Sequence, residues 1–439
     1  MSIKKSILLL TVFVTTSLTA QEVLTPEEAM KLTLENNLGI QIANNNLEIA
    51  ENNADILNSG FLPVLSGNAS GSIDRQNTEG ELGDGSTRSA DGVETRRYNA
   101  SLNLNYTIFD GLGRHYNYKS LKEQYGLSEL EARQTIESTI VQLFTVYYEV
   151  ARIEENNGNL KQALEISKDR LKRIKYQFDY GQATGLDVLN AEVDVNTDSI
   201  NVLNSDQLLR NTKRDLNLVI NRDLDAGFTV DTTVTFTSGL LMEEMFNDAK
   251  SNNVQMLIME KNISISNYDY KAVKSGFLPT IGLSGSYGWN EASNNNPLAF
   301  TVQNTSTGLS GGVSLAWDLF DGGRTITNTK NLKINYANQE LIKRQTELQV
   351  ERNIKNAWET YQNALFIYDT QEKNVLTTKN NFDRTEERYK IGQATSLEFR
   401  QAQINLLNAV LAKNQAKYTA KIAELIALQV SGQLLNTDF

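Results

Sequence analysis

Two long segments of the chain carry apolar residues at alternating intervals of three and four positions, the spacing of packed helices. In the later segment these residues are Ile354, Trp358, Tyr361, Leu365 and Tyr368. In the earlier segment they are Ile136, Ile140, Leu143, Tyr147 and Val150. Residues 324–391 include neither Gly nor Pro, so the sequence predicts one unbroken helix of about 100 Å there, at about 1.5 Å per residue. Gly126 and residues 156–159 are candidate positions for a kink in the earlier helix.

Just before each long helix the apolar period changes to two, which is the period of a strand. Runs of about 9–11 residues match a tilted strand that crosses a membrane, with one face on lipid and the other on water. A half-buried strand of a soluble protein shows the same alternation, so the pattern alone leaves both interpretations open. The predicted strands lie at about 62–74, 98–109, 279–290 and 308–320.

Three short strings recur in the same order and define a twofold internal repeat. The second and third strings are both displaced by 211 positions, so the segment between them keeps its length in both copies. A long segment that cannot change length is expected to span something of fixed thickness. The strings are SGFLP at 59–63 and 275–279, FDG at 109–111 and 320–322, and GQAT at 181–184 and 392–395.

The repeat divides the chain into two structural copies, an equatorial linker and a tail. Each copy is predicted to contain a helix, two strands and a long helical hairpin, at about 113–221 in the first copy and 323–431 in the second. Thr and Val alternate in the linker, which predicts a short strand, and residues 432–439 are its expected partner. Polar segments at 74–97 and 290–307 are predicted to be solvent loops between strands. The boundaries are 21–221 for the first copy, 222–245 for the linker, 246–432 for the second copy and 433–439 for the tail.

The N-terminus has the pattern of a secretory signal peptide. A basic start at Lys4 and Lys5 precedes a short apolar run and small residues up to Ala20. We therefore expect cleavage after Ala20 and a location outside the cytoplasm. Removal of residues 1–20 takes away two lysines and no acids, so the formal net charge of −11 becomes −13. Nucleic acid is not an expected partner, because phosphates require a basic surface.

The sequence offers little for catalysis or for cofactor binding. It contains no cysteine and a single histidine, His115. Neither thiolate chemistry nor a histidine-based metal cluster or catalytic triad can be assembled from this composition. No glycine-rich motif for phosphate binding occurs. We therefore expect no enzyme activity, no catalytic residue, no metal site and no cofactor.

The strand pairs are joined to the helices by residues that end or begin elements. The Gly and Pro of SGFLP stand where a helix must stop and a strand begin. The Asp of FDG is predicted to cap the long helix, and the following Gly to permit a sharp turn. These junction residues are Gly60, Pro63, Asp110 and Gly111 in the first copy and Gly276, Pro279, Asp321 and Gly322 in the second.

The GQAT strings interrupt the long helices and predict the tip of an αα-hairpin in each copy. Their threonines are predicted to cap the returning helices. Asp187 and Glu398 follow at the same displacement of 211 positions, so each returning helix carries a carboxylate in its first turn. A carboxylate there complements the helix dipole, which is the simplest interpretation of both. The tip residues are Gly181, Gln182, Ala183 and Thr184 in the first copy and Gly392, Gln393, Ala394 and Thr395 in the second.

One copy of the chain does not contain enough strands to seal itself against lipid. Four strands cannot close a barrel, and open sheet edges in lipid would leave backbone groups without hydrogen bonds. Several copies would therefore have to share one barrel. Three copies give twelve strands, an even number within the usual range of such barrels, so we predict a homotrimer.

The ordered repeat of helix, FLP, strand pair, FDG, long helix, GQAT and returning helix resembles the TolC-like outer-membrane efflux family, the outer membrane factors, over residues 25–432. The resemblance implies a mostly helical fold with transmembrane β-structure. It implies a trimeric twelve-stranded β-barrel, four strands per protomer, joined to a long α-helical coiled-coil barrel in the periplasm. The implied location is the outer membrane of a Gram-negative-type bacterium. The implied partners are outer-membrane lipid, a periplasmic adaptor (membrane fusion) protein and an inner-membrane transporter.

The resemblance also implies roles for the tips. Family hairpin tips contact the adaptor, and acids at the positions of Asp187 and Glu398 constrict the closed periplasmic end. The chain keeps both carboxylates, but Ala183 and Ala394 replace the arginine that some members use beside the second one. The implied function is the channel of a tripartite efflux system, a passive exit for small molecules expelled by the pump. Two alternatives stay open: the exit duct of a type I protein secretion system, and a secreted coiled-coil scaffold or adhesin.

Overall fold

The chain divides into two units, and each unit draws segments from both copies of the repeat. The predicted signal peptide, residues 1–20, lies outside the described residues. We call the two units the helical unit and the sheet unit. The helical unit comprises residues up to 41, 135–253 and 351 onwards, and the sheet unit comprises 42–134 and 254–350. The computed structural model describes residues 23–237, 239–297 and 299–437.

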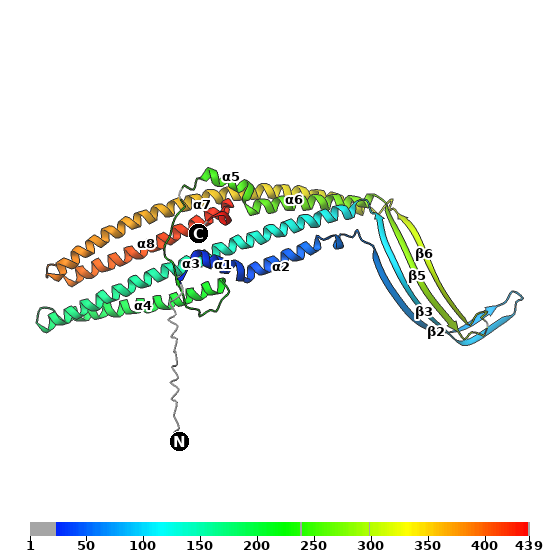
Figure 1. The fold of residues 1–439 in the computed structure, drawn as a ribbon, viewed down its shortest axis with the longest axis horizontal. Coiled ribbons are helices and arrows are strands. Elements are labelled where there is room, and N and C mark those ends of the chain that lie inside the picture. Colours follow the sequence, from blue (N-terminus) through cyan, green and yellow to red (C-terminus); the bar gives the residue numbers. More distant parts are fainter. Residues whose placement is uncertain (1–22, 238, 298, 438–439) are drawn as a thin grey trace, which may run out of the picture. The chain divides into compact units, whose positions relative to one another are not determined.

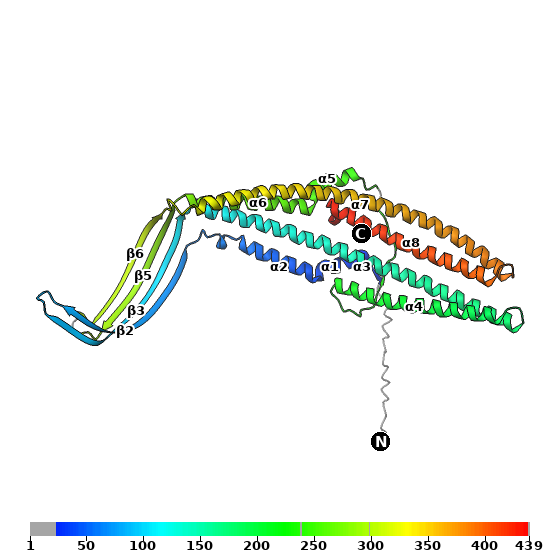
Figure 2. The same cartoon turned by 180° about the vertical axis from the view of Figure 1, so that it is seen from behind.

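Two long helical hairpins make up most of the helical unit, although the first residues of each hairpin, before 135 and before 351, belong to the sheet unit (Figures 1 and 2). In the first, α3 (Gly113–Asp179) turns into α4 (Gly185–Val219), and in the second, α7 (Arg324–Lys390) turns into α8 (Ser396–Ser431). α3 and α7 both have 67 residues, in agreement with the constant spacing between FDG and GQAT. α3 continues without a break through Gly126. The shorter helices are α1 (Pro26–Asn36), α2 (Leu38–Asn53), α5 (Met242–Asn252) and α6 (Val254–Val273).

The core of the helical unit follows the apolar seam that the sequence predicted on α3. Tyr148 stacks against Phe144 and lies 5.9 Å from Tyr418 of α8, measured between ring centres. Full burial of side chains of this size contributes about 1.5–3 kcal/mol each. Within the described chain, none of the helices is long and apolar enough to cross a membrane. Ile136 of the predicted seam is only partly buried. The other four residues are buried as predicted, at 1% exposure or less: Ile140, Leu143, Tyr147 and Val150.

The linker between the copies crosses the helical unit as a strap, described at residues 228–237 and 239–240. Its strand β4 (Thr229–Val230) pairs in parallel with β1 (Val23–Leu24). The predicted pairing with residues 432–439 is wrong, because the described part of that tail forms the short helix η3 (Leu434–Asn436). The hydroxyl of Tyr147 holds the two strands together, since it donates to the Leu24 carbonyl at 2.7 Å and accepts from the Asp231 amide at 3.1 Å.

Side chains from α4, α7 and α8 donate to the backbone carbonyls of the strap. Beyond β4 the strap does not pair with another strand in the described chain. The side chains of the helices therefore supply the hydrogen bonds that its backbone carbonyls require. α5 begins at Met242, so the predicted end of the linker at 245 lies inside that helix. The donors include Lys213 of α4 to Phe228 (2.6 Å), Lys421 of α8 to Thr235 (2.8 Å) and Trp358 of α7 to Leu240 (3.2 Å).

The sheet unit holds a four-stranded antiparallel sheet in the order β2-β3-β5-β6. The two hairpins, one from each copy of the repeat, join where β3 pairs with β5. β2 and β6 are therefore the edge strands. The strands are β2 (Val64–Glu81), β3 (Thr87–Phe109), β5 (Thr280–Asn294) and β6 (Gln303–Ala316).

The predicted strand ends require correction. β2 and β3 continue through most of residues 74–97, which the sequence predicted as a loop, and only residues 82–86 connect them. Backbone pairing and polar cross-strand pairs sustain this part of the hairpin, so no apolar alternation marks it. The observed strands at 64–81, 87–109, 280–294 and 303–316 replace the predicted strands at 62–74, 98–109, 279–290 and 308–320.

The two faces of the sheet differ in polarity, as the alternation predicted. Rows of directly paired residues show this difference across all four strands. Large side chains on the apolar face are well exposed in the single chain, with Leu309 at 83% and Val313 at 69%. One apolar row is Gly67, Leu102, Tyr287 and Leu309, and the adjacent polar row is Ser66, Asn103, Ser286 and Ser310.

Candidate functional site at the two hairpin tips

Both hairpins turn through the same backbone motif. Gly181 and Gly392 have φ angles of 72° and 77°, in the left-handed region that glycine enters without steric cost. The amide of Gln182 donates to the carbonyl five residues before it at 2.7 Å, and the amide of Gln393 does the same at 2.7 Å. This pattern is the Schellman ending of a helix. The repeated sequence therefore corresponds to repeated local structure.

A capping box begins each returning helix. The Thr184 hydroxyl accepts the Asp187 amide at 3.2 Å, and the Asp187 carboxylate accepts the Thr184 amide at 2.9 Å. Thr395 and Glu398 make the same two bonds at 3.2 and 2.7 Å. The predicted threonine caps are thus confirmed. Each carboxylate bonds to the threonine of its own tip.

The capping bonds predict a pH dependence of the tips. The Thr184 hydroxyl and amide lower the pKa of Asp187 below its ordinary 3.8, and the Thr395 amide and hydroxyl lower the pKa of Glu398 below its ordinary 4.5. Because a lowered pKa in the folded state stabilises above the ordinary pKa, this stabilisation is lost as the pH falls through and below those values. We expect hydrogen exchange at residues 185–188 to accelerate on such acidification, after correction for intrinsic rates. Thr184→Ala should exchange rapidly already at neutral pH, and a wild-type tip insensitive to acid would contradict the account.

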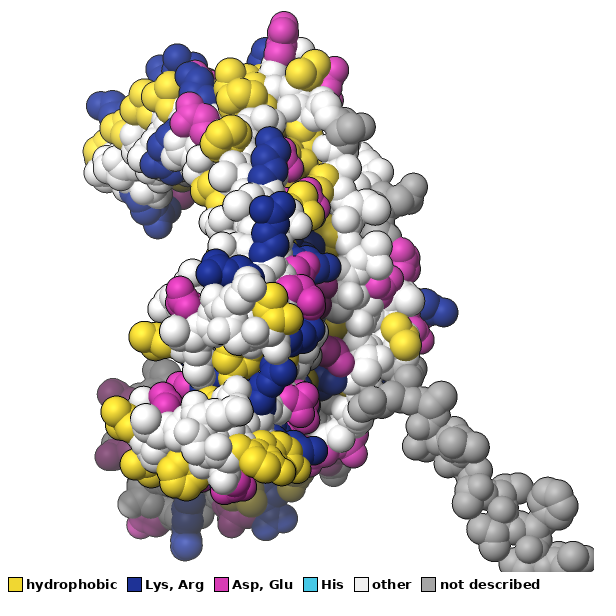
Figure 3. All heavy atoms as spheres, turned by 90° about the vertical axis from the view of Figure 1, so that its left-hand side faces the viewer, with side chains coloured by type: hydrophobic (Ala, Val, Ile, Leu, Met, Phe, Trp, Pro, Cys, Tyr) yellow, Lys and Arg dark blue, Asp and Glu magenta, His cyan; other side chains and the backbone are white. Residues whose placement is uncertain are grey.

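Each tip also exposes a pair of large apolar side chains that the sequence analysis did not identify. Tyr180 and Leu186 are 80% and 66% exposed, and Ile391 and Leu397 are 67% and 77% exposed. The pairs occupy equivalent positions of the repeat, which is the signal that would have revealed them. Figure 3 views this end of the chain, where apolar side chains lie at the surface among charged ones. Such a mixture is typical of a surface that binds another protein.

A buried group of charged side chains joins the two hairpins behind the tips; we call it the Arg400 cluster. Arg400 of α8 donates to both carboxylate oxygens of Asp198 on α4, at 2.7 and 2.9 Å. It also donates to the Ser167 hydroxyl of α3 at 3.0 Å. Arg170 of α3 forms an ion pair with Asp194 of α4. Arg400, Asp198 and Arg170 are 9%, 6% and 4% exposed, and the Asp194 side chain is 27% exposed, so the two arginines and two aspartates compensate one another in a largely buried group.

A further arginine reaches from α3 to the second tip. Arg173 donates to the Lys390 carbonyl at 3.2 Å, and its guanidinium lies 5.4 Å from the centre of the Tyr389 ring. Tyr389 in turn stacks on Phe399, with 4.8 Å between ring centres. Helix side chains therefore connect the hairpins, although Ala183 and Ala394 place no charge at the turns themselves. Sequence reasoning missed these contacts because their partners lie more than 200 positions apart.

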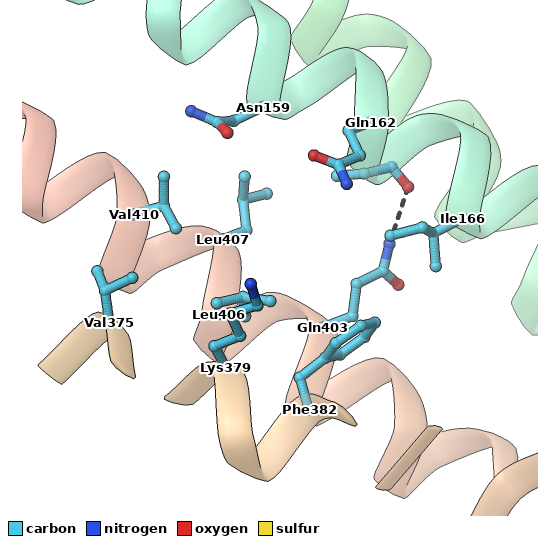
Figure 4. A pocket seen from close by; sticks show the side chains of 11 residues that line it. Asn159, Gln162, Ile166, Val375, Lys379, Phe382, Gln403, Leu406, Leu407 and Val410 are labelled. Carbon is cyan, nitrogen blue, oxygen red and sulfur yellow. Dashed lines mark hydrogen bonds between the residues drawn. The ribbon is translucent and has the colours of Figure 1, made fainter. Parts of the chain in front are cut away.

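A groove of roughly 230 Å³ lies between α3, α7 and α8 in the same unit (Figure 4). Its floor is mostly apolar, with Phe382 and Leu406 among the lining side chains, and Lys379 adds one positive charge. Gln403 closes one end, because its amide donates to the Ala163 carbonyl at 2.8 Å, the dashed line of Figure 4. A groove of this size and character fits side chains of a partner helix.

The prolines of SGFLP lie directly before strands, whereas the glycines lie in or just after the short helices that precede those strands. Pro63 directly precedes β2, and Pro279 directly precedes β5. Gly60 has a φ of 72° and follows the short helix η1 (Ile56–Asn58), whereas Gly276 lies inside η2 (Lys274–Phe277). The two copies therefore stop their helices differently but begin their strands alike.

The aspartates of FDG cap the long helices from outside them. Asp110 and Asp321 stand three residues before α3 and α7. Their carboxylates accept the amides of Arg114 and Thr325, both at 2.8 Å. They thereby satisfy one of the free amides of each first turn, as the sequence predicted. The next residues, Gly111 and Gly322, have φ angles of 70° and 73° and make the turn.

Comparison with known proteins identifies the family. The chain matches the family described as "Outer membrane efflux protein" over residues 29–222 and 245–431. It is 22% identical to the outer membrane efflux protein BepC of Brucella suis over 420 residues, which cover 94% of this chain and 88% of BepC. It is 24% identical to the outer membrane protein TolC of Vibrio cholerae over 331 residues, covering 71% and 73% of the two chains.

Solved structures share the fold. The Campylobacter jejuni CmeC outer membrane channel superposes with a TM-score of 0.77 at 20% identity, covering 93% of this chain and 86% of CmeC. The Neisseria gonorrhoeae MtrE outer membrane channel, in its open state, gives a TM-score of 0.71 at 19% identity, covering 93% and 89%. The chain therefore belongs to the outer membrane efflux protein family, a family of channels located in the outer membrane and extending into the periplasm, and the resemblance noted in its sequence is confirmed.

Proposed function

We propose that three copies of the chain form a passive outer-membrane duct, which receives small molecules from an inner-membrane pump through a periplasmic adaptor. The observation that carries this proposal is the four-stranded sheet, which has one exposed apolar face and two edges that no strand of the described chain pairs with. Lipid can cover the apolar face, but it cannot satisfy the free backbone groups of β2 and β6. Further copies of the sheet can satisfy them.

The strand directions support closure by identical copies. β2 and β6 run in opposite directions, because each of the three ladders between them is antiparallel. β6 of one copy can therefore pair with β2 of the next and continue the antiparallel pattern around a barrel. Two copies would give eight strands, and side chains fill the interior of an eight-stranded barrel. Three copies give twelve strands and leave room for a water-filled path.

The outer face of α4 also favours self-association. Five apolar residues recur there at intervals of three, four, seven and three positions, which is the spacing of a coiled-coil seam. All are between 57% and 66% exposed in the single chain. A helix of a neighbouring copy would cover them from Leu189 onwards, and Leu186 at the tip would remain accessible to the adaptor. The residues are Leu186, Leu189, Val193, Ile200 and Leu203.

The hairpin tips and the groove are the proposed contacts of the adaptor. The tip segments 181–184 and 392–395 are flanked by the exposed pairs Tyr180 with Leu186 and Ile391 with Leu397. An apolar centre with a polar rim is the usual composition of a protein interface. Energy would come from the pump, and the duct would supply only the path.

Asp187 and Glu398 are the proposed charges of the periplasmic gate. In a trimer they would form two rings of three carboxylates near the tips, and such rings favour cations. We expect Asp187→Asn combined with Glu398→Gln to weaken the cation preference in planar bilayers and to raise the conductance. These substitutions remove the charges but keep an oxygen acceptor for each cap.

The matched control keeps both carboxylates and weakens the caps. Thr184→Ala combined with Thr395→Ala removes the capping hydroxyls, so it should retain the cation preference of the wild type. A charge-free variant with unchanged current and unchanged selectivity would refute the gate assignment. A purified wild type that forms no channel at all would refute the proposed function.

A further inference from the structure

The polar face of the sheet is almost free of charge. Its residues alternate with the apolar face at 64–74, 95–105, 282–294 and 304–314, and Ser, Asn and Gly predominate among them. Several of these side chains bond to each other on the same face. Ser286 donates to Asn103 at 2.8 Å, and Asn99 donates to Ser70 at 3.3 Å. The middle of this face forms a polar hollow of roughly 650 Å³.

Within those four segments, Asp74 and Arg97 are the only charged residues on the polar face. The register pairs Ser72 with Arg97 and Asp74 with Thr95, so both side chains lie on the face that carries Ser70 and Asn99. Arg97 Nη1 lies 2.6 Å from Asp74 Oδ2. The two charges therefore cancel at hydrogen-bond distance.

The pair lies at the outer end of the apolar band. On the opposite face, Tyr98 and Trp289 occupy the neighbouring rows, and aromatic residues are typical of the membrane interface. Beyond them the opposite face turns polar, with Arg96 and Glu94. The side chains of Arg97 and Asp74 are 53% and 52% exposed. An ion pair so exposed contributes little to stability. Stability therefore does not explain why the pair occurs at this position.

We propose that Asp74 and Arg97 form a self-compensating charge pair at the outer mouth of the pore. Because the two charges cancel, the barrel does not select ions by the sign of their charge. This inference rests on the proposed function, because the polar face becomes a pore wall only in the closed trimer. There the pair would occur three times around the mouth. Three uncompensated charges of one sign would select ions, whereas three tight pairs give a field that falls off within a short distance and is screened by salt.

Three variants test the pair in planar bilayers under a KCl gradient. Arg97→Gln leaves the three aspartates and should shift the reversal potential towards cations, with a several-fold change in the permeability ratio. Asp74→Asn leaves the three arginines and should shift it in the opposite direction. The double variant Asp74→Asn with Arg97→Gln should return to the wild-type value. Opposite shifts with recovery in the double variant distinguish charge from a change in shape.

Two further substitutions keep the test decisive if a pair variant fails to assemble. Asn103→Asp adds an uncompensated carboxylate to the polar face, three rows away from Arg97, and it should also shift the potential towards cations. Thr305→Asp adds the same charge to the opposite face, in the row of Tyr98, and should leave the potential unchanged. Conducting pair variants that all keep the wild-type potential would overturn the inference and leave the channel function standing. A wild type without conductance would overturn both.

Discussion

Replacing Arg400 with methionine is expected to lower the free energy of unfolding of the helical hairpins by about 3–5 kcal/mol. Removal of one partner from a buried ion pair leaves the other charge without compensation, and that cost exceeds the value of the pair itself. Here Asp198 would lose both of its bonds to Arg400 while remaining 6% exposed. Denaturant unfolding of the detergent-solubilised protein, followed by its helical circular dichroism, measures the loss.

Two comparison variants make this test specific. Arg384→Met removes an exposed arginine of α7 and should change the free energy by no more than about 0.5 kcal/mol. Arg400→Met combined with Asp198→Asn removes the uncompensated charge and should recover part of the loss, a coupling that a double-mutant cycle quantifies. Equal losses for Arg400→Met and Arg384→Met would show that the cluster does not hold the hairpins together.

Gly111→Ala is expected to destabilise the sheet unit by about 3 kcal/mol, whereas its counterpart Gly322→Ala should cost about 1–2 kcal/mol. Both glycines have positive φ, 70° and 73°, so alanine strains the backbone equally in both copies. At Gly111, however, a new Cβ would lie 2.6 Å from the Ser275 carbonyl oxygen, while at Gly322 it would meet nothing within 4 Å. The extra steric cost is that of overpacking.

The difference between the two alanine variants is the informative quantity, because it cancels the shared backbone strain. Apparent melting of the purified protein, recorded by fluorescence and by loss of heat-resistant oligomer on gels, gives both values under the same conditions. If Gly322→Ala proved as damaging as Gly111→Ala, the close approach of Ser275 to the first junction would have no energetic role.

The helices and caps were predictable because they are local. An apolar seam every three or four residues, a left-handed glycine and a threonine three residues before an acid each determine the structure of one turn. Thr184 and Asp187 needed no information from the rest of the chain. The same holds for Pro63, directly before β2. The repeat strengthened each of these predictions, because two independent copies had to agree.

The strand ends and the cross-hairpin contacts were not predictable, for two different reasons. The outer part of β2 and β3 pairs through backbone and polar side chains, so no apolar alternation reveals it. The Arg400 cluster joins α3, α4 and α8 across more than 200 positions, and a single sequence does not encode which distant charges meet. The repeat also conceals local strain: Leu112 has a φ of 71° where the second copy has Gly323 with 85°.

The central claim is that three chains share one barrel wall, since a single sheet with edges β2 and β6 cannot be sealed in lipid. The most direct test is the mass of the detergent-solubilised particle, corrected for bound detergent by multi-angle light scattering. The account predicts three chains per particle. A single chain per particle, or a stable monomer recovered from the periplasm without detergent, would contradict it.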